Sequence, residues 1–73
     1  MKNSNHKLNN NIFGENLSKL LQQKNISQRQ FAKLVDTTPA TVNRWITGKR
    51  KPRFSQIIKI TKALGVSTEF LIS

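Results

Sequence analysis

The chain has 73 residues, of which 13 are lysine or arginine and three are aspartate or glutamate, so its formal net charge is +10. This length allows one small domain, and the absence of cysteine excludes disulfide bonds and thiolate metal sites. Three acidic residues and one histidine, His6 in a polar tail, are too few for acid–base catalysis or a metal centre. We therefore expect no enzymatic activity, no small-molecule substrate and no cofactor.

The positive charge favours a polyanionic partner, which is a nucleic acid, an anionic membrane or an acidic protein. No acidic residue lies between Asp36 and Glu69, and the basic residues of that stretch are Arg44, Lys49, Arg50, Lys51, Arg53, Lys59 and Lys62. No apolar run has the length of a membrane-spanning helix, and the N-terminus has no hydrophobic signal region. The sequence therefore predicts a soluble, cytoplasmic protein with no membrane partner.

Residues 1–11 are polar, rich in asparagine and without an apolar period, so we expect a disordered N-terminal arm. A solubilising tail is favoured over an arm that follows the DNA backbone with Lys2 and Lys7. The folded domain is expected to span residues 12–73.

Residues 12–24 predict the first helix, whose apolar face is formed by Phe13, Leu17, Leu20 and Leu21. Asn10 or Asn11 can cap its start, and Asn25 can end it in the left-handed conformation. Gly14 is expected to weaken this helix slightly.

Residues 27–48 predict two short helices joined by a tight turn. Ser27 and Gln30 have the spacing of a capping box, and the apolar stripe of the first helix is formed by Phe31, Leu34 and Val35. Asp36 and Thr37 interrupt that stripe.

The second helix of the pair has Thr38 as a candidate cap and Pro39 in the first helical position. Its apolar stripe is formed by Val42, Trp45 and Ile46, and Gly48 supplies the end. The other face is polar, as in a helix-turn-helix, whose second helix enters the DNA major groove. Trp45 is expected to pack between the helices of the motif.

The remaining chain predicts a basic loop over residues 48–53, a fourth helix over residues 54–64 and a short fifth helix capped by Ser67. The apolar face of the fourth helix is expected to comprise Phe54, Ile57, Ile60 or Thr61, and Leu64, with Ile58 and Ala63 beside it. The apolar C-terminal residues Phe70, Leu71 and Ile72 can close the core, form a dimer contact, or do both.

The chain resembles the phage-repressor and Cro-type helix-turn-helix family, also called the xenobiotic-response-element family, over residues 13–71. The residues that carry the resemblance are Gln28, Ala32, Val42, Trp45, Gly48, Lys49, Pro52, the segment 63–67, Phe70 and Leu71. The resemblance implies an all-α, compact five-helix fold like that of lambda repressor, with a central helix-turn-helix. Asp36 occupies the turn position where the family usually has glycine, so we expect it to adopt the left-handed conformation at a small cost.

The resemblance also implies a DNA interface. The residues expected to contact bases are Pro39, Ala40, Thr41, Asn43 and Arg44. Arg44 can bind guanine in a bidentate manner, whereas Pro39, Ala40 and the methyl group of Thr41 can pack on a thymine methyl group. Asn43 can reach adenine or a phosphate. Pro39 and Ala40 replace the polar residues that usually form hydrogen bonds with bases at these positions. We therefore expect sequence recognition to depend more on Arg44 and on DNA shape.

The residues expected to contact phosphates are Gln28, Thr38, Thr47, Lys49, Lys51 and Arg53, with Arg50 less strongly indicated. Gln28 lies at the N-terminus of a helix, where free N–H groups favour an anion.

The sequence therefore predicts a DNA-binding transcriptional regulator, with repression favoured, that acts as a homodimer at least on DNA. The expected location is the cytoplasm, in association with the nucleoid, and the expected source is a prokaryote or a phage. Two alternatives are an antitoxin or protein-interaction module with a helix-turn-helix, and the DNA-binding half of a longer repressor.

Overall fold

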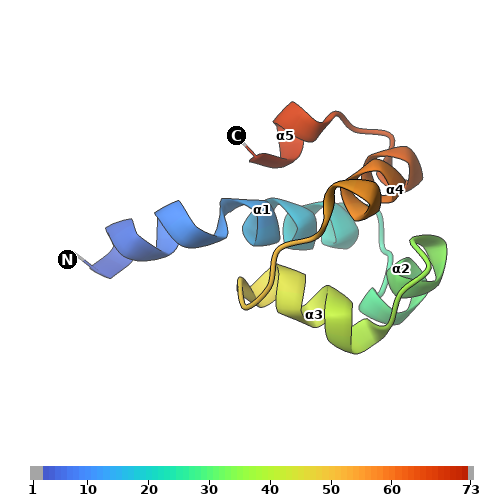
Figure 1. The fold of residues 1–73 in the computed structure, drawn as a ribbon, viewed down its shortest axis with the longest axis horizontal. Coiled ribbons are helices and arrows are strands. Elements are labelled where there is room, and N and C mark those ends of the chain that lie inside the picture. The colour runs from blue at the N-terminus through green and yellow to red at the C-terminus, as the bar shows by residue number, and fades with distance from the viewer. Residues whose placement is uncertain (1–2, 73) are drawn as a thin grey trace.

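The computed structural model describes the backbone of residues 3–72 and the side chains of residues 11–72. Its helices are α1 (Asn3–Gln23), α2 (Gln28–Leu34), α3 (Pro39–Thr47), α4 (Phe54–Leu64) and α5 (Thr68–Ile72). In Figure 1, α1 runs through the middle of the molecule, with α4 and α5 on one side and α2 and α3 on the other. The all-α, five-helix prediction is confirmed. Within the described range, no helix is apolar over a length that could span a membrane.

α1 begins earlier than predicted and is bent. The structure gives residues 3–10 a helical backbone where the composition indicated a disordered arm, and residues 1–2 lie outside the described range. Asn11 has non-helical angles of φ −139° and ψ 26°, so the bend falls where the predicted arm ends. In Figure 1, the segment before the bend extends away from the other helices. A separate role for residues 1–11 stays a prediction.

Asn11 does not cap α1 in the way that the sequence indicated. Its side-chain Nδ2 donates a hydrogen bond of 3.2 Å to the carbonyl oxygen of Ile46 in α3. Its Oδ1 is buried and has no hydrogen-bond partner among the described residues. A tertiary contact has therefore replaced the local capping bond.

The predicted boundaries of the helix-turn-helix are confirmed by local geometry. Gln30 N–H donates to Ser27 Oγ at 3.0 Å, and Ser27 N–H donates to Gln30 Oε1 at 2.9 Å, which completes the capping box. Thr38 Oγ1 accepts from Thr41 N–H at 3.2 Å. The residues with a positive φ are Asn25 at 58°, Asp36 at 61°, Gly48 at 84° and Gly65 at 69°. Each ends a helix or forms the turn, as expected.

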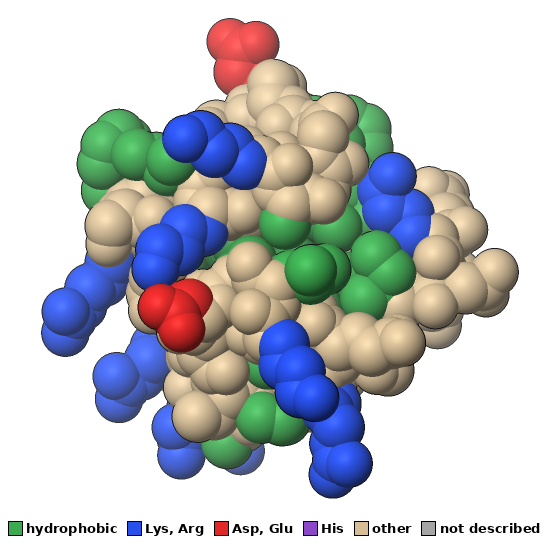
Figure 2. Space-filling view, turned by 90° about the vertical axis from the view of Figure 1, so that its right-hand side faces the viewer, with side chains coloured by type: hydrophobic (Ala, Val, Ile, Leu, Met, Phe, Trp, Pro, Cys, Tyr) green, Lys and Arg blue, Asp and Glu red, His purple; other side chains and the backbone are tan. Residues whose placement is uncertain are grey.

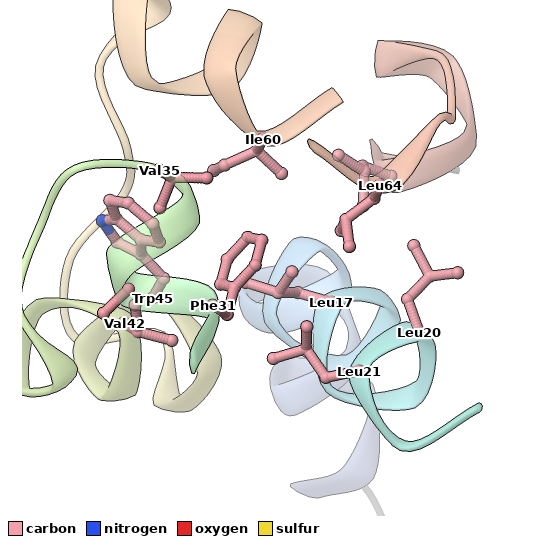
Figure 3. Packing of buried hydrophobic residues seen from close by; sticks show 11 residues of the cluster. Leu17, Leu20, Leu21, Phe31, Val35, Val42, Trp45, Ile60 and Leu64 are labelled. Carbon is pink, nitrogen blue, oxygen red and sulfur yellow. The ribbon is translucent and has the colours of Figure 1, made fainter. Parts of the chain in front are cut away.

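One hydrophobic core joins all five helices. Its buried members are Leu17, Leu20, Leu21, Phe31, Ala32, Val35, Val42, Trp45, Ile60, Leu64 and Leu71. Figure 3 shows Phe31 of α2 between Leu17 of α1 and the side chains of α3. Neither short helix of the motif can bury its apolar stripe alone, so this core fixes the angle at which α3 is presented.

Four predicted apolar contacts are wrong. Leu34, Phe54 and Ile58 are 58%, 77% and 39% exposed, respectively, and Ala63 is exposed as well. In α2, Ala32 rather than Leu34 flanks the buried pair Phe31 and Val35. Phe54 is the first residue of α4 and lies six residues before Ile60, the first buried residue of that helix.

Gly14 has a packing role that helix propensity did not indicate. A Cβ atom at this position would lie 2.6 Å from the carbonyl oxygen of Trp45 and would also clash with that of Ile46. The backbones of α1 and α3 therefore approach too closely for any side chain, and glycine permits their contact.

Candidate nucleic-acid interface

α3 presents one face to the core and the other to solvent. Val42 and Trp45 are 0% and 1% exposed, respectively, and Ile46 is half-buried against the core. The predicted base-contacting residues Pro39, Ala40, Asn43 and Arg44 are exposed, whereas Thr41 is half-buried. The structure therefore leaves four of these five side chains open to a ligand on one side of the same helix.

The threonines of α3 and its cap are already hydrogen-bonded within the protein. Thr38 Oγ1 donates to Thr41 Oγ1 at 3.1 Å, which holds both hydroxyl groups at the start of the helix. Thr47 Oγ1 donates to the Arg44 carbonyl oxygen at 3.4 Å. To donate a hydrogen bond to a phosphate, the hydroxyl group of Thr38 or Thr47 must therefore rotate and give up the bond that it donates within the protein.

The basic loop is tied to the end of α3. The N–H groups of Lys49 and Arg50 donate to the carbonyl oxygen of Arg44 at 2.9 and 3.2 Å. The cationic side chains of the loop, from Lys49, Arg50, Lys51 and Arg53, are all exposed. Because the loop is attached to Arg44 through its backbone, the start of the loop has a fixed position relative to the base-facing side of α3.

Gln28 lies apart from the loop, at the first position of α2. It is half-buried and lines a hollow between α1, α2 and the end of α3, together with Ser18, Gln22, Asn25, Ser27 and Ile46. Because Ile46 of α3 also lines this hollow, Gln28 lies near α3. It does so at a different place from the basic loop.

The acidic side chains leave the predicted interface without an ion pair in the part of the chain whose side chains the structure describes. Asp36 lies 3.5 Å from Lys59 of α4, which is not one of the predicted DNA contacts. Among the side chains of residues 11–72, no ion pair involves Arg44, Lys49, Lys51 or Arg53. Figure 2 faces the α2 and α4 side of the molecule and shows basic side chains standing out along its left and lower edges. The positive charge is thus available to an external polyanion.

A hollow between α3 and the start of α4 contains residues that sequence reasoning did not place in the interface. Trp45 and Gln56 line it, beside Thr41, Arg50, Lys51 and Arg53. The three-residue spacing of Arg53 and Gln56 could have indicated that Gln56 lies at the start of α4. There, Gln56 Oε1 accepts a hydrogen bond of 2.8 Å from Arg53 N–H. No group of three or more metal-ligating side chains exists in the described part of the chain.

An all-helical domain with these features defines a class of protein. Its two central helices form a helix-turn-helix, the second helix has an exposed polar face, and an unneutralised basic loop follows. Proteins of this class are DNA-binding helix-turn-helix regulators.

Comparison with known families agrees, because residues 17–71 match the model of a family described as "Helix-turn-helix". The chain belongs to this helix-turn-helix family, of the xenobiotic-response-element type.

Two curated relatives come from Bacillus subtilis strain 168. The chain is 34% identical over 61 residues to the SPbeta prophage-derived HTH-type transcriptional regulator YonR, with 84% of this chain and 56% of YonR covered. It is 31% identical over 61 residues to the HTH-type transcriptional regulator YqaE, with 84% and 53% covered. The chain thus spans about half the length of these relatives.

A solved structure has the same fold. The restriction-modification controller protein C.AhdI from Aeromonas hydrophila superimposes with a TM-score of 0.80 at 27% sequence identity. The match covers 86% of this chain and 96% of C.AhdI, so it includes most of both molecules.

Proposed function

We propose that this protein binds double-stranded operator DNA in a sequence-specific manner and regulates transcription, as a repressor that covers a promoter. The observation that carries the proposal is the exposed Arg44 face of α3, attached through the Arg44 carbonyl to an exposed basic loop. Such an arrangement directs one set of side chains at base edges and another at phosphates. The relatives named as transcriptional regulators support the same assignment.

The proposed roles follow the chemistry of each side chain. Arg44 would read a guanine, Asn43 an adenine or a phosphate, and Pro39, Ala40 and Thr41 the methyl groups of thymines. The proposed phosphate contacts are Gln28, Thr38, Thr47, Lys49, Lys51 and Arg53. Base contacts would set the sequence preference, and phosphate contacts would set affinity and its dependence on salt.

We further propose that the protein binds as a homodimer. The exposed apolar side chains of α4 and α5, from Phe54, Ile58, Phe70 and Ile72, support this because a second copy could cover them. A symmetric dimer would place two α3 helices in successive major grooves, with half-sites about 34 Å apart. The protein would act where this DNA lies, in the cytoplasm of a prokaryote or phage-infected cell, and the proposal gives it no catalytic step.

The proposal is tested by selecting binding sites from random double-stranded DNA at near-physiological salt. We expect recovery of a two-fold symmetric sequence with half-sites about one helical turn apart. Sedimentation of the protein with the selected duplex should then give two chains per site. Enrichment of no sequence would contradict the proposal and favour a protein-interaction module, such as an antitoxin.

A further inference from the structure

The hollow between α3 and the start of α4 is basic on its rim. Arg50, Lys51 and Arg53 contribute its charged side chains, and Thr41 and Gln56 contribute neutral polar groups. No acidic residue lines it. A concave site with this set of side chains fits an anion rather than a cation or an apolar ligand.

Trp45, which is one of the residues that line this hollow, has a buried donor that lacks an acceptor. Trp45 is 1% exposed, and its indole Nε1 has no hydrogen-bond partner among the described residues. Figure 3 shows this nitrogen turned away from Phe31 and the core, toward the chain that connects α3 to α4. Because buried tryptophan N–H groups usually have a partner, this orphan donor requires a physical explanation.

The start of α4 borders the hollow through Arg53 and Gln56 and carries further donors. The side chain of Arg53 makes no capping bond, and the N–H group of Arg53 is used by Gln56 Oε1. This leaves the amides of Phe54 and Ser55 without an acceptor among the described residues. α4 has 11 residues, and the positive end of its dipole adds to the attraction for an anion.

We propose that this hollow binds one phosphate group of the DNA backbone and that the indole N–H of Trp45 is its buried donor. The inference rests on the proposed function, since the phosphate belongs to the strand beside the groove that α3 enters. The exposed side chains of Arg50 and Lys51 would close over the phosphate while the indole holds one of its oxygens from below. Trp45 thus packs the core with its ring and binds the ligand with its edge.

The first test uses the single tryptophan of the chain as a reporter. One indole N–H signal appears in a proton–nitrogen correlation spectrum of the labelled full chain, and it is followed as the selected operator duplex is added. We expect a downfield proton shift and slower exchange with water. If DNA shifts the amide signals of Thr41 and Arg44 but leaves the indole signal in place, the inference is wrong and the proposed function stands. If the duplex shifts no signal at all, both are wrong.

A parallel titration with inorganic phosphate distinguishes a phosphate of the DNA backbone from a free phosphate ion as the ligand. A response of the indole signal to both DNA and inorganic phosphate supports a phosphate site. A response to inorganic phosphate alone would overturn the assignment to the DNA backbone, because the site would then serve a free anion.

The second test removes only the donor. Replacing Trp45 by 3-benzothienylalanine exchanges the N–H group for sulfur and preserves the shape of the ring, whereas Trp45→Phe also leaves space in the core. We expect the sulfur analogue to bind the operator and unrelated duplexes about three- to tenfold more weakly, to the same degree for all sequences.

The contacted phosphate is then located with duplexes that carry one uncharged methylphosphonate at each successive position. At one position, the substitution should weaken the native protein but have a smaller effect on the sulfur analogue, because the two changes remove the same hydrogen bond. Equal effects on both proteins at every position would overturn the inference.

Discussion

The side-chain Nδ2 of Asn11 lies 3.2 Å from the carbonyl oxygen of Ile46, so the bend of α1 is joined directly to the last turn of α3. The same asparagine lies against the backbone at Gly48, where a Cβ atom would be 2.8 Å from its Oδ1. The bend in α1 and the end of the helix proposed to read DNA therefore form one structural unit.

Gly14→Ala should destabilise the protein, although alanine is the better helix former. The added Cβ would meet the carbonyl oxygens of Trp45 and Ile46, so we expect unfolding to become easier by about 1–3 kcal/mol. Chemical denaturation measures this change. Gly65→Ala is the comparison variant, because a Cβ at Gly65 meets nothing within 4 Å. Its loss of stability reports the cost of a positive φ without a steric clash. A Gly14→Ala protein as stable as the native chain would exclude the close approach of α1 and α3.

The turn of the motif contains backbone strain at Asp36, which has a φ of 61°. Asp36→Gly and Asp36→Ala both remove the exposed ion pair with Lys59, so the difference between them isolates the backbone. We expect the glycine variant to be more stable than the alanine variant by about 1–2 kcal/mol, because glycine has no Cβ to oppose this conformation. Thermal unfolding of the two proteins side by side provides the measurement, and equal stabilities would exclude strain at this turn.

Arg44→Ala should weaken binding to the selected operator by about 1–3 kcal/mol and relax the preference at one base pair. The reason is the loss of a bidentate contact with a guanine edge. Titrations against the operator and its single-base variants measure both effects. Lys62→Ala, which removes an exposed charge at the other end of α4, is the control and should change neither. An equal loss on every sequence would identify Arg44 as a phosphate contact.

Lys49→Ala should lower affinity by a similar factor for all sequences. Because one fewer counterion is released on binding, the slope of log affinity against log salt should become shallower by about one. Titrations at several salt concentrations give this slope. Lys24→Ala, an exposed lysine after α1, should leave the slope as it is. An unchanged slope in Lys49→Ala would remove this residue from the interface.

Signals within a few residues of each other were sufficient to predict the helix ends from the end of α1 onward, but not the start of α1. The bonds between Ser27 and Gln30 and the left-handed angle at Asp36 depend on neighbours in sequence, so spacing and residue type determine them. The helix-turn-helix and the five-helix order followed from these signals.

The direction that each short helix faces was not predictable to the same degree. Leu34 and Phe54 have the spacing of core residues, yet their exposure depends on where neighbouring helices pack. The bond from Asn11 to Ile46 joins residues 35 positions apart, and no local pattern indicates it. The assignment of individual side chains to bases or phosphates stays a prediction, because it depends on the ligand.

The carbonyl oxygen of Arg44 accepts from the N–H groups of Lys49 and Arg50 and from the hydroxyl group of Thr47. These hydrogen bonds depend on the number of residues between Arg44 and Arg50. They depend much less on which side chains the loop carries. Substitution of the basic side chains of the loop would leave these backbone hydrogen bonds in place. An inserted or deleted residue between Thr47 and Arg50 would instead break this junction and rotate Arg44 relative to the loop. Related chains should therefore diverge here by substitution rather than by changes of length.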